Sequence, residues 1–202
     1  SKVLAGEVVT LSVDREHIPA KHRSLIKAFF DEADMSADAI KTVDFPPAYG
    51  ADIVVSCEKA KDPKNGSIYL KPTQFVLGIG CRRNTAFENI DRAIRQSLLK
   101  LQIDISDIDM IASIDVKKDE PGIKQFCDRN RIEFVTYTAD ELMAVQGEFS
   151  ASQFVREHVG VDNVCERAAV LACSRECNEA GKLVYKKHKY DRVTVAAARY
   201  PD

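Results

Sequence analysis

Short apolar runs separated by polar turns predict an α/β segment at the start of the chain. A β-rich run at 8–13 indicates a strand, and apolar residues with helical spacing follow Pro19. A second, buried strand is expected at 51–57, after a proline-rich break. The Asn65-Gly66 pair then predicts a hairpin turn whose second strand is 67–70.

From residue 75 the pattern becomes a regular alternation of strands and helices. The expected strands are 75–79, 110–116, 133–137, 182–186 and 192–197. The expected helices are a long one capped by Asn84 or Thr85, with an apolar face of Ile90, Ala93, Ile94, Leu98 and Leu101, followed by 120–129, 139–145 and 164–177. The last two strands are close enough to pair antiparallel, which makes the sheet mixed. The predicted fold class is α/β, with a three-layer α/β/α sandwich at 73–202 preceded by a small α/β domain at 1–72.

The charge and hydrophobic composition of the chain excludes some classes of binding partner. The 29 basic and 31 acidic residues nearly cancel, so no global field draws the chain to nucleic acid or to a membrane surface. No apolar run approaches the roughly 20 residues that span a bilayer, and the start lacks the order of a signal peptide. A cytoplasmic protein is expected, and any anionic ligand must be held by a local patch.

The cysteines and histidines predict no metal site. The six cysteines are expected as free thiols, mostly buried, because the chain carries no secretory signal. Cys165, Cys173 and Cys177 share one predicted helix, but their spacing matches no zinc or iron–sulfur motif. The histidines are expected to be solvated in loops or on helix surfaces: His17, His22, His158 and His188.

A glycine–arginine turn is the first candidate site. Gly78 and Gly80 stand where a strand gives way to a helix, the edge at which open α/β sheets bind ligands. Arg82 and Arg83 add two planar cations suited to carboxylate or phosphate groups. A dinucleotide fingerprint would need glycine at position 83, so nucleotide binding is disfavoured. The alternative stays open that the glycines only allow close strand–helix packing and the arginines are solvated.

A second charged turn follows the next strand. Parallel pairing would bring Lys117, Lys118 and Glu120 to the same edge as the arginines. Glu120 is either a first-turn helix carboxylate or a general acid–base held among lysines.

A serine turn is the third candidate. Ser150 and Ser152 are expected to contact the substrate or to cap the helix that follows. A nucleophilic serine is disfavoured, because no G-x-S-x-G elbow surrounds them and His158 is not brought close by its spacing alone.

Five segments, in order, resemble the C-terminal domain of the cobalamin-biosynthesis CbiG family. They are Leu77-Gly-Ile-Gly-Cys-Arg-Arg83, Ser113-Ile-Asp-Val-Lys-Lys-Asp-Glu-Pro-Gly122, Tyr137-Thr-Ala-Asp-Glu-Leu142, Phe149-Ser-Ala-Ser152 and Val159-Gly-Val-Asp-Asn-Val-Cys-Glu-Arg-Ala-Ala169. The resemblance spans nearly all of 75–200, while 1–72 resemble the middle region of the same proteins. The family's usual N-terminal domain is not among these residues, so we expect a fragment, and the sequence leaves open whether this chain alone is active.

The resemblance implies a reaction of the anaerobic cobalamin pathway. These enzymes hydrolyse the δ-lactone of cobalt-precorrin-5A, release acetaldehyde and yield cobalt-precorrin-5B. The cobalt arrives with the substrate, so no cofactor is implied. The substrate is an anionic tetrapyrrole rimmed with carboxylates, which suits the cations of the two charged turns.

The resemblance also implies roles for two further residues. Arg167 would add a carboxylate contact, and Glu166 a second candidate acid–base. As a hypothesis, Glu120 or Glu166 activates water while the glycine-turn amides stabilise the oxyanion. The competing interpretation is a non-catalytic tetrapyrrole-binding module, and the sequence leaves a homodimer open.

Overall fold

The computed structural model describes residues 7–19, 21–23, 26, 40–47, 51–57, 67–150, 160–177 and 180–201. The chain divides into two compact units, Ser1–Thr73 together with Asp202, and Gln74–Pro201. The division falls one residue beyond the boundary expected from the sequence. Each unit buries apolar residues in a cluster of its own.

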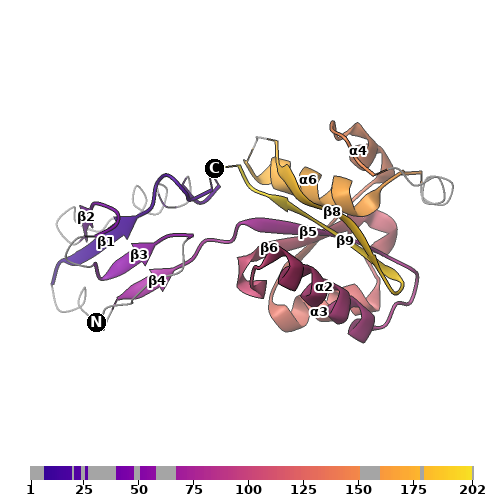
Figure 1. Ribbon diagram of the computed structural model, residues 1–202, viewed down its shortest axis with the longest axis horizontal. Helices are drawn as coiled ribbons and strands as arrows, with labels where there is room; N and C mark the ends of the chain where they lie inside the picture. The colour runs from indigo at the N-terminus through magenta and orange to yellow at the C-terminus, as the bar shows by residue number, and fades with distance from the viewer. Residues whose placement is uncertain are drawn as a thin grey trace. The chain divides into compact units, whose positions relative to one another are not determined.

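The first unit contains a four-stranded sheet in which every pairing is parallel (Figure 1). Its strands are β1 Val9–Val13, β2 Ile40–Val43, β3 Ile53–Val55 and β4 Ile68–Leu70, in the order β2-β1-β3-β4. Leu11 on β1 and Val55 on β3 are buried together with Ile18. Because the strands are parallel, their carboxyl ends share one edge of the sheet.

The expected antiparallel hairpin with 67–70 as its second strand is wrong, because β3 and β4 run parallel, with Ile53 opposite Ile68. Asn65 and Gly66 themselves lie outside the described residues. A two-residue turn joins only antiparallel strands, so a parallel partner requires a crossover connection instead. Strand β2 is not predicted from the sequence, since its four residues, Ile-Lys-Thr-Val, show no clear periodicity. Pairing with β1 makes this segment a strand.

A five-stranded mixed sheet forms the centre of the second unit. Its strands, in the spatial order β7-β6-β5-β9-β8, are β7 Glu133–Tyr137, β6 Ile108–Ile114, β5 Phe75–Cys81, β9 Val193–Arg199 and β8 Lys182–Tyr190. β5, β6 and β7 are parallel, whereas β9 runs antiparallel to both β5 and β8. The βαβαβα series and the closing antiparallel pair are therefore confirmed.

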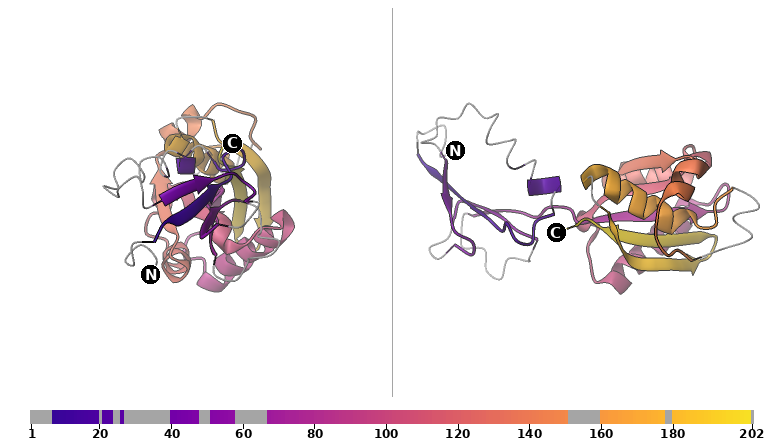
Figure 2. Two further views of the ribbon diagram at one scale, coloured as in Figure 1. Left: turned by 90° about the vertical axis from the view of Figure 1, so that its left-hand side faces the viewer. Right: turned by 90° about the horizontal axis from the view of Figure 1, so that it is seen from above.

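Helices cover both faces of this sheet (Figures 1 and 2). Successive residues of β5 point to opposite faces, so Leu77 joins the apolar cluster under α2 and α3, while Val76 joins the cluster under α6 and α4. The helices are α2 Phe87–Leu101, α3 Pro121–Asn130, α4 Ala139–Ala144 and α6 Val164–Cys177. The predicted α/β/α sandwich is confirmed.

Two local predictions need correction. The expected strand 110–116 ends at Ile114 and continues as a short 3-10 helix, Asp115–Lys117. The cap of α2 is Ala86, without a side-chain hydrogen bond, rather than Asn84 or Thr85. The Thr85 hydroxyl instead donates to the Arg82 carbonyl oxygen at 2.7 Å, because the turn after β5 folds back on itself.

In the part of the chain that the structure describes, no helix is long and apolar enough to cross a membrane. Nor do the described residues contain a group of three or more His, Cys, Asp or Glu side chains placed to hold a metal ion. All six cysteines lie in described segments, and none of them is in a disulfide.

Candidate functional site

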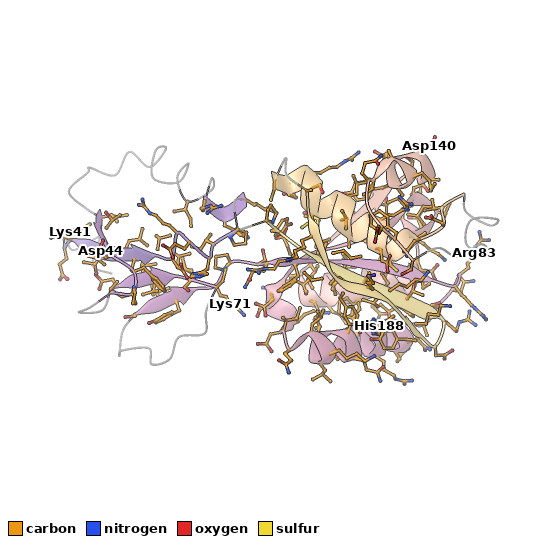
Figure 3. The ribbon with its side chains drawn as sticks, turned by 45° about the horizontal axis from the view of Figure 1, so that its top comes forward. Lys41, Asp44, Lys71, Arg83, Asp140 and His188 are labelled. Atoms are coloured by element: carbon orange, nitrogen blue, oxygen red, sulfur yellow. The ribbon has the colours of Figure 1, made fainter. Side chains whose placement is uncertain are left out.

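The residues of the two charged turns gather at the carboxyl edge of the second unit's sheet. Arg82 and Arg83 follow β5, and Lys118 follows the short helix after β6. Carboxyl ends of parallel strands meet at one edge, where open α/β sheets bind ligands. Figure 3 shows Arg83 projecting from this end of the second unit.

The turn between β8 and β9 brings a further cation to the same edge. The Arg82 N–H donates to the Arg192 carbonyl oxygen at 3.0 Å, and Nη2 of Arg192 donates to the Arg83 carbonyl oxygen at 3.3 Å. Arg82, Arg83, Lys118 and Arg192 are all exposed, and we call them the cationic edge. Sequence reasoning missed Arg192, and only the predicted pairing of the last two strands hinted at its position.

Glu120 joins the two charged turns. Its carboxylate accepts a hydrogen bond from the Thr85 N–H at 2.9 Å. It also forms an ion pair with Nζ of Lys117 at 3.1 Å. The side chains of Glu120 and Lys117 are only 4% and 13% exposed, so the pair is largely removed from water. Lys117 is thus neutralised by Glu120 rather than presented to a ligand.

Cys81 ends β5 beside these groups. Burial raises the pKa of its thiol to about 11, against the opposing effect of the Lys117 charge. The thiol is therefore protonated at neutral pH and is a poor nucleophile, since the thiolate is the reactive form.

Gly78 lies in the interior of the second unit. A Cβ at this position would lie 1.7 Å from the carbonyl oxygen of Cys165, so α6 crosses β5 in direct backbone contact. This close approach supports the packing interpretation for Gly78. Gly80 is partly exposed, and its carbonyl oxygen accepts a hydrogen bond from the Thr194 hydroxyl at 3.2 Å.

Glu166, which is itself fully buried, is the centre of a second network. One carboxylate oxygen accepts from the Ser150 N–H at 2.7 Å, and the other accepts from the Ser150 hydroxyl at 2.8 Å and the Lys187 N–H at 2.6 Å. Asn163 caps α6 through the Glu166 N–H and also donates to the Ser150 carbonyl oxygen. These bonds fasten the serine turn and β8 to the start of α6.

Arg167 is engaged by partners within the protein. Its guanidinium pairs with both oxygens of Asp162, at 2.8 and 3.2 Å, and donates to the carbonyl oxygens of Leu142 and Val145. The same group lies 4.6 Å from the ring centre of Phe149. Ser152, the other serine of the turn, lies outside the described residues.

Residues 75–198 match the protein family described as "Cobalamin synthesis G C-terminus". The chain belongs to this family. The cobalamin synthesis G match covers almost all of the second unit and includes both the cationic edge and the Glu166 network.

Curated relatives of this cobalamin synthesis G chain carry the name of one enzyme. The chain is 38% identical over 102 residues to the cobalt-precorrin-5A hydrolase of Salmonella typhimurium, across 50% of this chain and 29% of that protein. It is 31% identical over 137 residues to the probable cobalt-precorrin-5A hydrolase of Methanocaldococcus jannaschii, across 65% of this chain and 42% of that protein. The chain thus spans less than half the length of these relatives.

Solved structures share the fold. CobE, a protein from the cobalamin biosynthetic pathway, aligns with a TM-score of 0.60 and 26% identity, across 63% of this chain and 90% of CobE. The structure of a putative cobalamin biosynthesis protein G homolog from Sulfolobus solfataricus aligns at a TM-score of 0.50 and 18% identity. The alignment covers 96% of this chain and 51% of that protein. The second likeness concerns the fold alone.

Proposed function

We propose that the protein to which this chain belongs is a cobalt-precorrin-5A hydrolase, which opens the δ-lactone of its substrate and releases acetaldehyde to give cobalt-precorrin-5B. The match of this chain to hydrolases of that name, at 38% and 31% identity, carries the proposal. The cobalt enters as part of the substrate. With cysteines that are all free of disulfides, we assign the reaction to the reducing cytoplasm.

Within this function, the second unit binds the anionic macrocycle through the cationic edge. Arginine guanidinium groups hold carboxylates with paired hydrogen bonds, and the substrate carries several acetate and propionate carboxylates. Arg82, Arg83 and Arg192 are exposed and lie on two turns that hydrogen bond to each other. The edge is therefore a preformed carboxylate-binding surface.

A specific observation favours binding, rather than chemistry, as the role of the second unit. The carboxylates proposed as acid–base groups, Glu120 and Glu166, are 5% and 0% exposed, and both hold backbone N–H groups of other segments. CobE, which is aligned over 90% of its length, corresponds in extent to this unit. We propose that both carboxylates position the binding surface.

The proposal is tested with the full-length protein and cobalt-precorrin-5A. Wild-type protein is expected to release one acetaldehyde for each substrate consumed, measured by coupled alcohol dehydrogenase. If the protein binds the substrate but releases no acetaldehyde, its function is that of a non-catalytic tetrapyrrole-binding module.

The cationic edge is tested by the double substitution Arg82→Ala, Arg83→Ala. Loss of two charge-assisted carboxylate contacts is expected to weaken substrate binding by about 100-fold, from about 1.5 kcal/mol for each contact. The measurement is a titration followed by the visible absorbance of the macrocycle. Arg95→Ala, which removes an exposed arginine on α2, is the matched control, and equal affinity of the two variants would contradict this role.

A further inference from the structure

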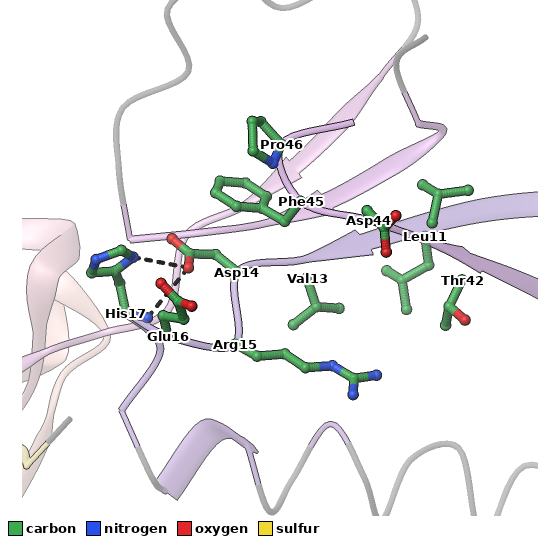
Figure 4. Close-up of a pocket in the computed structure, with 11 residues that line it drawn as sticks. Leu11, Val13, Asp14, Arg15, Glu16, His17, Thr42, Asp44, Phe45 and Pro46 are labelled. Atoms are coloured by element: carbon green, nitrogen blue, oxygen red, sulfur yellow. Dashed lines mark hydrogen bonds and ion pairs between the residues drawn. The ribbon is translucent and has the colours of Figure 1, made fainter. Parts of the chain in front are cut away.

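The first unit contains a cavity at the carboxyl edge of its own parallel sheet. Its volume is about 510 Å³, within the range of small-molecule sites. The walls combine apolar side chains of β1 and β2 with charged groups from the turns that follow these strands (Figure 4). This volume suits one ring and its ester group rather than a whole tetrapyrrole.

The position of Asp14 matches the place where such sheets bind ligands. The chain leaves β1 for β2 on one side, and leaves β3 for β4 on the other, so the connections diverge between β1 and β3. Ligands of such sheets bind near this switch point, beyond the carboxyl ends of the strands. The cavity lies on the β2 side of Asp14, because its lining comes from β1, β2 and the turns that follow them. Asp14 directly follows β1, and its N–H donates to the Val55 carbonyl oxygen of β3 at 2.9 Å.

The carboxylate of Asp14 is buried and oriented. It is 2% exposed and accepts a hydrogen bond from the Ser56 hydroxyl at 3.1 Å. His17 contributes two more bonds to Oδ1, from its backbone N–H at 3.3 Å and from ring Nδ1 at 3.0 Å. Burial alone raises the pKa of Asp14, but the hydrogen bonds from His17 and Ser56 outweigh it and hold the pKa below its usual value.

An ionised Asp14 determines the tautomer of His17. A carboxylate only accepts hydrogen bonds, so Nδ1 of a neutral His17 carries the proton and Nε2 carries the lone pair. The imidazole is 58% exposed, in contrast to its buried partner, and it lines the cavity. An imidazole whose Nδ1–H is held by a buried aspartate is the arrangement that orients a general base.

We propose that His17, held by Asp14, is the general base that activates water for opening of the lactone. This inference rests on the proposed function. Nε2 takes a proton from water as the water oxygen bonds to the carbonyl carbon of the lactone. The ring C–O bond then breaks, and the departing oxygen receives that proton from the imidazolium.

The other candidate bases lack these properties. Glu120 and Glu166 are buried and hold hydrogen-bond donors of their own unit on both oxygens, whereas the His17 ring is exposed and is held by a buried carboxylate. Leu11 and Val13 supply an apolar wall of the cavity, and Arg15 adds a cation at the turn that carries His17. The cavity therefore offers a base, an apolar surface and a positive charge for an ester that becomes a carboxylate.

The test compares His17→Ala with wild type in the full-length protein. Turnover is expected to fall at least about 100-fold, the usual contribution of a general base, while the affinity for cobalt-precorrin-5A changes less than about threefold. Added imidazole is expected to restore acetaldehyde release, because the ring position is exposed. Asp14→Asn keeps the imidazole but no longer fixes the proton on Nδ1 of His17. This variant is expected to lower kcat, and added imidazole is not expected to restore it.

Glu7→Gln is the matched control, since it removes an exposed carboxylate of the same unit outside the cavity lining and is expected to keep wild-type turnover. Two outcomes would overturn this inference and leave the proposed function standing. One is full turnover by His17→Ala, and the other is a loss of turnover that imidazole does not restore in a variant that still binds substrate. If His17→Ala does not fold, His17→Gln replaces it with the same criteria for turnover and affinity. Absence of acetaldehyde from wild-type protein would overturn the proposed function as well.

Discussion

Buried carboxylates show how single residues organise the second unit. Glu120 connects the turns after β5 and β6, and Glu166 connects the serine turn and β8 to α6. Burying an ionised group lowers the free energy of unfolding unless hydrogen bonds replace its contacts with water. Both carboxylates have a donor on each of their two oxygens. Their main effect is to hold backbone segments in place.

Glu166→Gln is expected to lower the free energy of unfolding by about 2–4 kcal/mol, because an amide NH₂ would face donors that now reach a carboxylate. Three donors are affected, the Ser150 N–H and hydroxyl and the Lys187 N–H. Urea unfolding followed by circular dichroism measures the change.

The control is Glu176→Gln, an exposed position on the same helix, which is expected to change stability by less than about 0.5 kcal/mol. Equal stabilities of the two variants would show that the Glu166 network contributes little to folding.

At the scale of elements, the crossing of β5 and α6 sets the shape of the binding edge. Gly78 allows the strand to touch the backbone of α6 at Cys165, the second residue of the helix. The same strand ends at Cys81, from which the cationic edge begins. A shift of α6 would therefore displace the network around Glu166 together with the end of β5.

Gly78→Ala is expected to destabilise the second unit by about 3 kcal/mol or more, because the new Cβ would overlap a backbone carbonyl that cannot move without the helix. Thermal unfolding followed by circular dichroism provides the measurement.

Gly80→Ala is the comparison, since its Cβ would meet only the Thr194 hydroxyl, at 2.7 Å, and a side chain can rotate away. A smaller loss is expected there, and the reverse ranking would contradict the backbone contact proposed for Gly78.

At the scale of the whole molecule, the chain consists of two units that each bury their own apolar residues. The second unit contains both apolar clusters of the α/β/α sandwich, and CobE aligns over 63% of the chain. Such a unit has the core that independent folding requires.

Residues 74–201 expressed alone are therefore expected to unfold in one cooperative transition. The measurement is urea unfolding followed by circular dichroism at two wavelengths, which should give coincident curves. A fragment without a sigmoidal transition would show that the second unit depends on the rest of the chain.

Much of the second unit was predictable because its signals are local and repeated. Apolar residues of α2 recur at helical spacing, and those of β6 form a run long enough for a buried strand. The first unit was harder, since β2 has no periodic pattern and the Asn65-Gly66 turn signal says nothing about which strand pairs with which. Pairing direction depends on contacts between distant segments.

The sequence by itself determined the order of elements in the second unit, its sandwich class and the positive charge after β5, because spacing and residue type are local properties. Only the tertiary structure decided how those residues are used. It buries Gly78 under α6, engages Glu120, Glu166 and Arg167 within the protein, and adds Arg192 to the cationic edge. It also pairs His17 with a buried Asp14 at a switch point that exists only once strands have paired. Burial and hydrogen-bond partners are properties of the folded chain, so residue type alone does not reveal them.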